Sequence, residues 1–80
     1  MRASAYVMIN VRAGKGKLVM DELAKLKNVA DVEAVSGPYD IVASVTGSDF
    51  NELGRLVIER IQVIDGIEKT LTCNVINFEQ

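Results

Sequence analysis

Two short segments carry the groups best suited to hold a small charged ligand. The first contains Gly37 and Asp40, and the second contains Gly66, Thr70 and Thr72. Backbone N–H groups around the two glycines, together with the threonine hydroxyls, can bind a carboxylate, and Asp40 can pair with an ammonium group. The same residue types are also ordinary in turns and strands, and the residues alone favour that simpler interpretation.

Other kinds of site chemistry lack the residues that they need. The chain has no histidine and a single cysteine, Cys73, which we expect to be a buried small hydrophobe. The segment from Gly14 to Lys17 resembles a phosphate loop only faintly, because Leu18 stands where Ser or Thr would hold magnesium and Val11 where the first Gly is required. We therefore expect no metal, no cofactor and no catalytic residue, and we do not expect an enzyme.

The composition limits the class of protein and its partners. Eighty residues, of which 49% are hydrophobic and 25% charged, indicate one globular domain spanning residues 1–80. A net charge of −2 and only four Tyr and Phe residues do not favour nucleic-acid binding. The N-terminal segment has the pattern of neither a signal peptide nor a membrane span, so we expect a cytoplasmic protein without a membrane partner.

Hydrophobic spacing predicts the elements that must position the candidate residues. Alternation with period two indicates strands, and apolar residues three or four positions apart indicate helices. In chain order we expect a strand over residues 4–12, a helix over 17–28, strands over 30–36 and 39–46, a helix over 50–64 and a strand over 67–78. Asp49 and Glu52 fit a capping box. The second helix should bury one stripe, formed by Phe50, Leu53, Val57, Ile61 and Ile64.

This β-α-β-β-α-β order predicts an α+β, ferredoxin-like fold: a four-stranded antiparallel sheet with two helices on one face. The helix-covered face is expected to hold Ala5, Val7, Ile9, Val11, Val32, Ala34, Ile41, Ala43, Val45, Leu71, Cys73 and Val75. The open face is expected to hold Tyr6, Met8, Val35, Val42, Ile76 and Phe78. Such an apolar patch usually marks an interface, which predicts a sheet-to-sheet homodimer; the alternative is scattered surface hydrophobes.

Two motifs resemble those of one protein family. The stretch SGPYDIV (residues 36–42) resembles the Gly-x-Tyr-Asp-hydrophobic hairpin of the Lrp/AsnC transcriptional regulators. The stretch DGIEKTLT (residues 65–72) resembles the segment that opens their last strand. The resemblance covers the whole chain but only the effector domain of the regulators, the RAM domain. It implies an amino-acid-binding domain that dimerises through its sheet and assembles into rings of eight or ten subunits.

The resemblance also implies where the ligand binds. The site should lie between neighbouring dimers, and the carried-over residues are Gly37, Tyr39 and Asp40 from the hairpin, Thr70 and Thr72 from the last strand, and Leu56 and Arg60 from the second helix, off its core stripe. We expect weak binding of a neutral or hydrophobic amino acid, linked to the oligomeric state.

The chain departs from the family at its N-terminus. The first sheet strand begins within about five residues of Met1, where no helix-turn-helix fits, so we expect a stand-alone RAM domain that acts alone or joins full-length regulators without contacting DNA itself. Two alternatives remain open. One is a small dimeric α+β barrel enzyme, although such enzymes usually use His, Asn or Trp. The other is an ACT-type amino-acid sensor, whose ligand loop would be residues 12–16.

Overall fold

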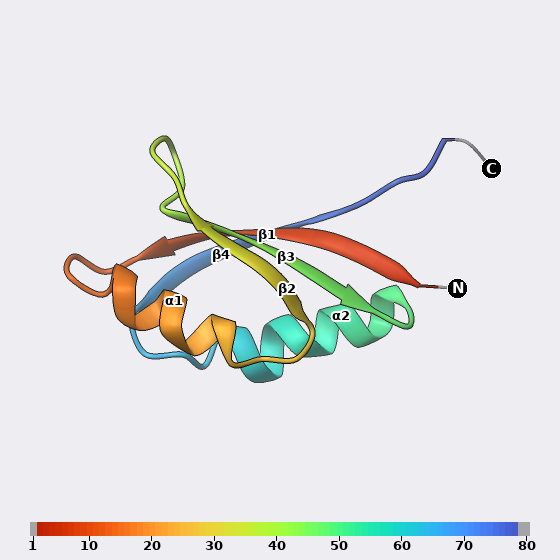
Figure 1. Cartoon of the computed structure of the whole chain (residues 1–80), viewed down its shortest axis with the longest axis horizontal. Coiled ribbons are helices and arrows are strands. Elements are labelled where there is room, and N and C mark those ends of the chain that lie inside the picture. Colours follow the sequence, from red (N-terminus) through yellow and green to blue (C-terminus); the bar gives the residue numbers. More distant parts are fainter. Residues whose placement is uncertain (1, 79–80) are drawn as a thin grey trace.

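The computed structural model describes residues 2–78. Its elements in chain order are β1 (Ala3–Val11), α1 (Gly16–Ala24), β2 (Val29–Ala34), β3 (Ile41–Gly47), α2 (Phe50–Leu56), the π-helical turn η1 (Val57–Ile61) and β4 (Ile67–Asn74). The strands form one antiparallel sheet in the order β2-β3-β1-β4, and the helices cover one of its faces (Figure 1). The predicted ferredoxin-like fold is confirmed. No helix within residues 2–78 is long and apolar enough to cross a membrane.

The second helix begins where its capping residues predict. The Asp49 carboxylate accepts a hydrogen bond from the Glu52 backbone N–H at 2.8 Å. Glu52 Oε1 in turn accepts from the backbone N–H of Ser48 at 2.6 Å and from its hydroxyl at 2.8 Å. These hydrogen bonds lower the pKa of Glu52, with the backbone N–H as the largest cause. The side chains thus satisfy N–H groups that the first helical turn leaves unpaired.

The same helix ends in a way that the hydrophobic pattern does not reveal. Its last turn widens into η1, where the Gln62 backbone N–H donates to the Val57 carbonyl five residues earlier at 2.8 Å. Such π-helical turns are rare and usually short. The continuous α-helix expected over residues 50–64 is therefore wrong at its end: it is π-helical over Val57–Ile61 and stops there.

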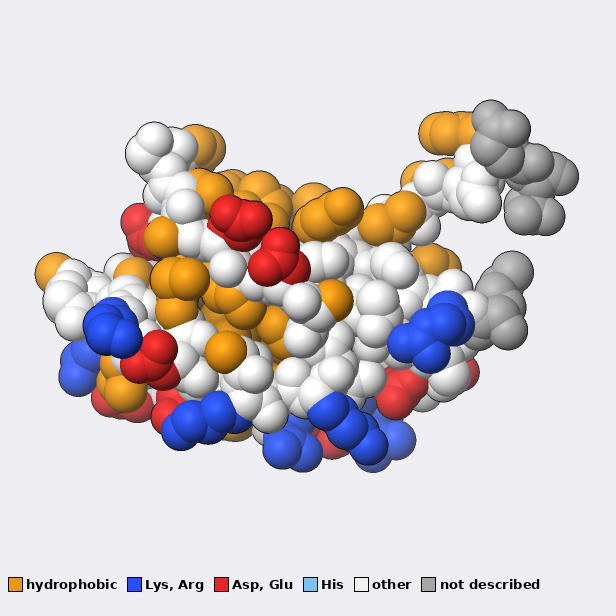
Figure 2. Space-filling view, in the orientation of Figure 1, with side chains coloured by type: hydrophobic (Ala, Val, Ile, Leu, Met, Phe, Trp, Pro, Cys, Tyr) orange, Lys and Arg blue, Asp and Glu red, His pale blue; other side chains and the backbone are white. Residues whose placement is uncertain are grey.

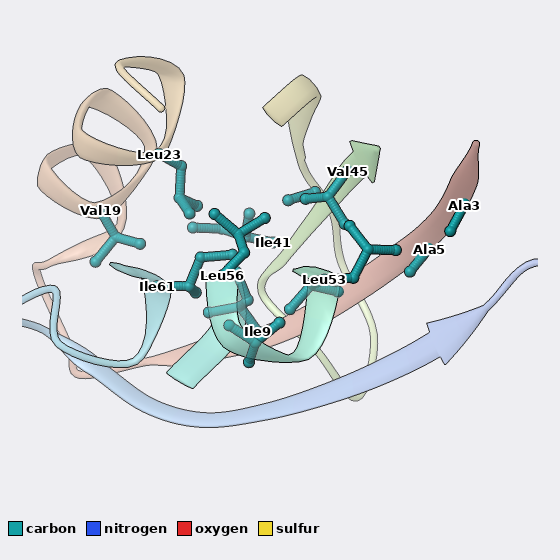
Figure 3. Packing of buried hydrophobic residues seen from close by; sticks show 13 residues of the cluster. Ala3, Ala5, Ile9, Val19, Leu23, Ile41, Val45, Leu53, Leu56 and Ile61 are labelled. Atoms are coloured by element: carbon teal, nitrogen blue, oxygen red, sulfur yellow. The ribbon is translucent and has the colours of Figure 1, made fainter. Parts of the chain in front are cut away.

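The core lies between the sheet and the helix layer (Figure 3). Alternate residues of β1 and β3 pack against α1, α2 and η1, and the buried set is Ala3, Ala5, Val7, Ile9, Val19, Leu23, Ile41, Ala43, Val45, Leu53, Leu56, Val57 and Ile61. Two helix predictions are wrong. Leu56 is only 7% exposed, because it lies three residues after Leu53 on the same side of the helix. Phe50 is 49% exposed, because it lies beside Arg2 and Ala3 at the end of the sheet.

The last strand presents the opposite faces from those expected. Antiparallel partners share a face, and Leu71 pairs with Met8 while Cys73 pairs with Tyr6. The register shifts next to Ile67, which pairs with Val11 and packs on the core, whereas Lys69 pairs with Asn10. This bulge inserts one residue, so the alternation that starts at Ile67 changes face.

Because of this bulge, several residues of the last strand lie on the opposite face from the one predicted. Leu71 and Cys73 lie on the open face and are exposed, and Val75, also exposed, follows the end of β4. Placing these three on the helix-covered face was wrong. Thr70 and Thr72, which pair with Ile9 and Val7, lie on the helix-covered side instead.

Candidate functional site

The hairpin between β2 and β3 is tied to the end of β1. The Asp40 backbone N–H donates to the Ile9 carbonyl at 2.9 Å, and Asp40 Oδ2 accepts from the Val11 backbone N–H at 2.9 Å. Asn10 Nδ2 donates to the Pro38 carbonyl at 3.0 Å. These three hydrogen bonds hold the hairpin so that it projects on the open side of the sheet (Figure 1).

The hairpin exposes the groups that a ligand would need. Gly37 has a φ of +144°, which side-chain-bearing residues rarely adopt, and a Cβ there would meet nothing within 4 Å. Its backbone is therefore open to solvent, and Tyr39 is half-buried beside it. Asp40 is exposed, and within residues 2–78 its second oxygen, Oδ1, receives no hydrogen bond. That oxygen is available to a cationic group.

Thr70 is the better placed of the two predicted threonines. It lies half-buried on the edge strand β4, and its hydroxyl oxygen accepts a hydrogen bond from Gln62 Nε2 at 2.9 Å. A polar hollow beside it is lined by Gln62, Ile67, Glu68 and Lys69. Gln62 was not predicted as a site residue, because a glutamine after the end of a helix is an ordinary surface residue. Thr72 is exposed further along β4.

The two predicted halves of the site do not meet within one chain. Thr70 and Asp40 flank Ile9 from opposite sides, so β1 runs between them. Two strand spacings are about 9–10 Å. The hairpin also projects on the open side, whereas Thr70 lies on the helix-covered side. Within one chain the two halves therefore lie apart, on opposite sides of the sheet.

The helix residues carried over from the family stand apart from the hairpin. Leu56 belongs to the core, so its prediction as an off-stripe ligand residue is wrong. Arg60 is exposed and lines a shallow hollow between α1 and η1, together with Leu18, Glu22 and Leu26. Neither residue lies at the hairpin or on β4.

The turn before β4 is packed rather than open. Gly66 is buried with a φ of +104°, and an added Cβ would lie 2.8 Å from Lys15 Cβ. Its carbonyl accepts from the Arg12 backbone N–H at 2.8 Å. Arg12 also pairs with Asp65 at 2.8 Å, and this hydrogen bond, with Lys15 nearby, lowers the pKa of Asp65. This turn therefore joins α1 to β4, with Gly66 buried between them.

The open face is apolar, as predicted, but its members differ in part. Tyr6 is 49% exposed, Leu71 is 48% exposed, and Met8 and Val42 are partly exposed between them. Val35 is exposed at the base of the hairpin. Ile76 and Phe78 lie beyond β4, in a segment that leaves the sheet (Figure 1), so placing them on the strand face was wrong. Within residues 2–78, no cluster of three or more His, Cys, Asp and Glu side chains could hold a metal ion.

The fold and these surfaces define the class of protein: a ferredoxin-like α+β domain with an open apolar sheet face and a projecting hairpin at one end. Residues 4–78 match the Lrp/AsnC ligand binding domain. The chain belongs to this family, and it is a ligand-binding domain related to transcriptional regulators.

Known relatives agree with this assignment. The chain is 40% identical over 68 residues to an uncharacterised helix-turn-helix-type transcriptional regulator of Pyrococcus abyssi, an alignment that covers 85% of this chain and 43% of the relative. The chain thus spans less than half the length of that regulator. A crystal structure of a protein from Thermus thermophilus matches with a TM-score of 0.90 and 33% identity, covering 98% of both chains.

Two further matches concern ligands and enzymes. A transcriptional regulator of Neisseria meningitidis, solved as a complex with L-Met, has the same fold with a TM-score of 0.85 and 16% identity, over 98% of this chain and 52% of that one. A stretch of 58 residues is 38% identical to homocitrate synthase of Sulfurisphaera tokodaii, covering 72% of this chain but only 12% of the enzyme.

Proposed function

We propose that this domain binds a neutral or hydrophobic amino acid at a site completed by another copy of the chain, and that binding changes its oligomeric state. The observation that carries the proposal is the separation of the two site halves by β1. A site divided in this way links ligand affinity to assembly, because only the assembled form presents both halves. The L-Met complex of the Neisseria regulator supports an amino acid as the ligand class.

The available groups suit the two charges of an amino acid. Asp40 Oδ1 would accept from the ammonium group while Oδ2 keeps its hydrogen bond to Val11. Thr70 accepts from Gln62, so its own hydroxyl proton is left to donate to the carboxylate. The exposed backbone at Gly37 and the ring of Tyr39 would contact the ligand from the hairpin side. Thr72 would extend the β4 half.

The open apolar face would pair two chains sheet to sheet, and pairs would then assemble into rings of eight or ten subunits. Full-length Lrp/AsnC regulators offer a matching domain and are the proposed protein partners, in the cytoplasm. We propose that residues 1–80 act as one domain in these assemblies. The net charge of −2 supports a role through partners rather than through direct DNA contact.

We also propose that the domain is not itself catalytic. The match to homocitrate synthase covers only 12% of that enzyme, which fits a regulatory segment better than a catalytic one. The ACT-type alternative would place the ligand at the loop before α1, where Gly14 has a φ of +81° and open space around it. Substituting each loop separately distinguishes the two sensor types.

A thermal-shift screen of the twenty amino acids, read together with light scattering, tests the proposal. A ligand at ten times its Kd stabilises a protein by about 1.4 kcal/mol, which raises the Tm of a chain of this size by roughly 5–10 °C. We expect one or a few neutral amino acids to raise the Tm and to change the scattering mass. If no amino acid changes either quantity, the effector proposal fails.

Three variants test where the amino acid binds. Asp40→Asn keeps an oxygen for the Val11 N–H but removes the charge, and we expect it to weaken amino-acid binding about tenfold. Asp49→Asn is the matched control, because asparagine caps a helix as well as aspartate and Asp49 lies away from the hairpin. Loss of binding in Gly14→Ala with retention in Asp40→Asn would instead favour the ACT-type site.

A further inference from the structure

A hollow of about 260 Å³ opens in the helix layer, between the end of α1 and the junction of α2 with η1. Figure 2 shows Lys and Arg side chains along this layer, at the lower edge of the view. Two leucines form the apolar part of the hollow, and three cations and one amide form its polar part. The lining residues are Lys25, Leu26, Lys27, Asn28, Leu56 and Arg60, so no carboxylate is among the described residues that line it.

Two of the three cations in this hollow have no partner. Lys25 Nζ pairs with Glu22 Oε2 at 2.9 Å. Within residues 2–78, the side chains of Lys27 and Arg60 form neither an ion pair nor a hydrogen bond. Two positive charges at one hollow repel each other, and an anion between them would turn this repulsion into attraction.

The carboxylates next to the hollow are engaged elsewhere. Glu52 and Glu59 line an adjoining hollow of about 210 Å³ that shares Arg60 with the first one. Glu52 Oε1 accepts hydrogen bonds from Ser48, and Glu59 Oε2 pairs with Arg55 at 3.6 Å. The positive charge of Arg60 is therefore left without a direct contact to an acid in the part of the chain that the structure describes.

A simpler role for cations near helix ends is to interact with the last carbonyl groups of the helix. This role suits Lys25, which directly follows α1. It does not account for Lys27 and Arg60, because neither donates to a carbonyl group within residues 2–78. These two cations also come from segments far apart in the sequence, and the fold brings them to the same hollow.

The polar groups of the hollow suit a phosphate group. A guanidinium offers a planar fork of N–H donors and an ammonium offers a point charge, and both bind phosphate oxygens. Asn28 Nδ2 donates to the Thr46 carbonyl at 2.9 Å, which leaves its second N–H as a further donor. A phosphate monoester carries about 1.5 to 2 negative charges, which the free charges of Lys27 and Arg60 match. A single carboxylate would leave one of them uncompensated.

We propose that this hollow binds the phosphate group of a small phosphorylated metabolite, with Lys27 and Arg60 contacting the phosphate oxygens. Leu26 and Leu56 would contact the uncharged part of the ligand, and the adjoining hollow gives room for the rest of it. The site lies in the helix layer of one chain. It is therefore separate from the amino-acid site proposed at the hairpin and β4, and it does not depend on that proposal.

Inorganic phosphate and glycerol phosphate are the probes, titrated at low ionic strength because salt weakens exposed charge interactions. Isothermal titration calorimetry measures the affinity, and we expect each probe to bind once per chain with a Kd in the millimolar range. Nitrogen-15 NMR locates the binding, and we expect the signals of the Asn28 side-chain amide and of Arg60 Nε–H to shift. No heat and no shift with either probe would overturn the proposal.

Charge-removing variants test the two cations. Lys27→Gln and Arg60→Gln should each raise the Kd of both probes about tenfold, and Arg60→Lys should retain part of the affinity. Lys17→Gln is the matched control, because it removes one charge from an exposed lysine near the start of α1 that pairs with Asp21, and we expect no change in Kd. Lys27 and Arg60 are exposed, so their variants should fold, and circular dichroism checks this.

Two results would contradict the assigned position or ligand. If phosphate shifts the signals of residues 14–17 and leaves those of Asn28 and Arg60 unchanged, or if the Lys27 and Arg60 variants bind as well as the control, the hollow is not the site. Vesicles that contain phosphatidic acid distinguish a lipid headgroup from a soluble ester. Co-sedimentation with these vesicles without binding of glycerol phosphate would overturn the metabolite as the ligand.

Discussion

The two faces of the sheet are built from the same strands and similar apolar residues, but only one of them is covered. On β1, Val7 and Ile9 have no exposed surface, whereas Tyr6 between the same partner strands is half exposed. A small domain with two apolar sheet faces can cover just one with two helices. The covered face therefore stabilises the fold, whereas the open face is the surface that we propose binds a second copy.

The largest loss of stability should come from truncating a buried side chain on the covered face. We expect Ile9→Ala to lower the free energy of unfolding by about 2–5 kcal/mol, because it removes buried methyl groups and leaves a cavity. Its neighbour Met8 points to the open face, and Met8→Ala should lower the stability of the separated chain by much less. Urea denaturation at a protein concentration below the dimer Kd measures the free energy of unfolding of both variants. Equal losses would contradict the different roles of the two faces.

The next effect should come from the two glycine turns at the same end of the sheet. Gly66→Ala introduces a Cβ at 2.8 Å from Lys15 Cβ in addition to backbone strain, so we expect a loss of about 2–4 kcal/mol. Gly37→Ala has open space and carries only the backbone strain, about 1–2 kcal/mol. Thermal denaturation of both variants checks the order. A greater loss for Gly37→Ala would contradict the packed and open turns described here.

A smaller effect is expected at the cap of α2, which belongs to the covered layer. Asp49→Ala removes the acceptor of the Glu52 N–H and should cost about 1 kcal/mol, whereas Asp49→Asn should cost little. Helical circular dichroism during urea unfolding follows the difference. Equal stability of the alanine and asparagine variants would show that the cap contributes nothing.

The smallest effect concerns pH. Hydrogen bonds from Ser48 hold the pKa of Glu52 below its ordinary value of 4.5. A group with a lowered folded pKa stabilises the fold above its unfolded pKa and loses that contribution as the pH falls through its folded pKa. The stability difference between the unmodified chain and Glu52→Gln should therefore be constant above about pH 5 and shrink at lower pH. A difference that does not change with pH would contradict this assignment.

The sequence predicted the order of elements, the cap at Asp49 and the buried residues of β1 and β3, because each rests on a local pattern. The faces of β4 could not be predicted, since one bulged residue after Ile67 reverses the alternation and nothing in the sequence marks it. Leu56 was predicted to lie outside the buried stripe, because that stripe contained only a narrow row of apolar residues. A helix that packs over a sheet also buries residues on the flank of such a row.

Motifs predicted candidate residues in both halves of the proposed site, but the sequence did not predict the contacts that hold the β4 half. Gly37 and Asp40 are identified by their motif, and the hydrogen bonds to β1 explain why that motif holds its shape. The contact between Gln62 and Thr70 joins residues eight positions apart across the end of a π-helical turn, which no residue type signals. The division of the site by β1 follows from strand order, and pairing in the sheet is a property of the whole chain.

Sedimentation velocity of the unmodified chain at low micromolar concentration tests the role of the open face most directly. If that face binds a second copy, the chain sediments with about twice the 8.7 kDa mass of one chain or as a multiple of that dimer. A single species at 8.7 kDa would contradict the assignment of this face as an interface.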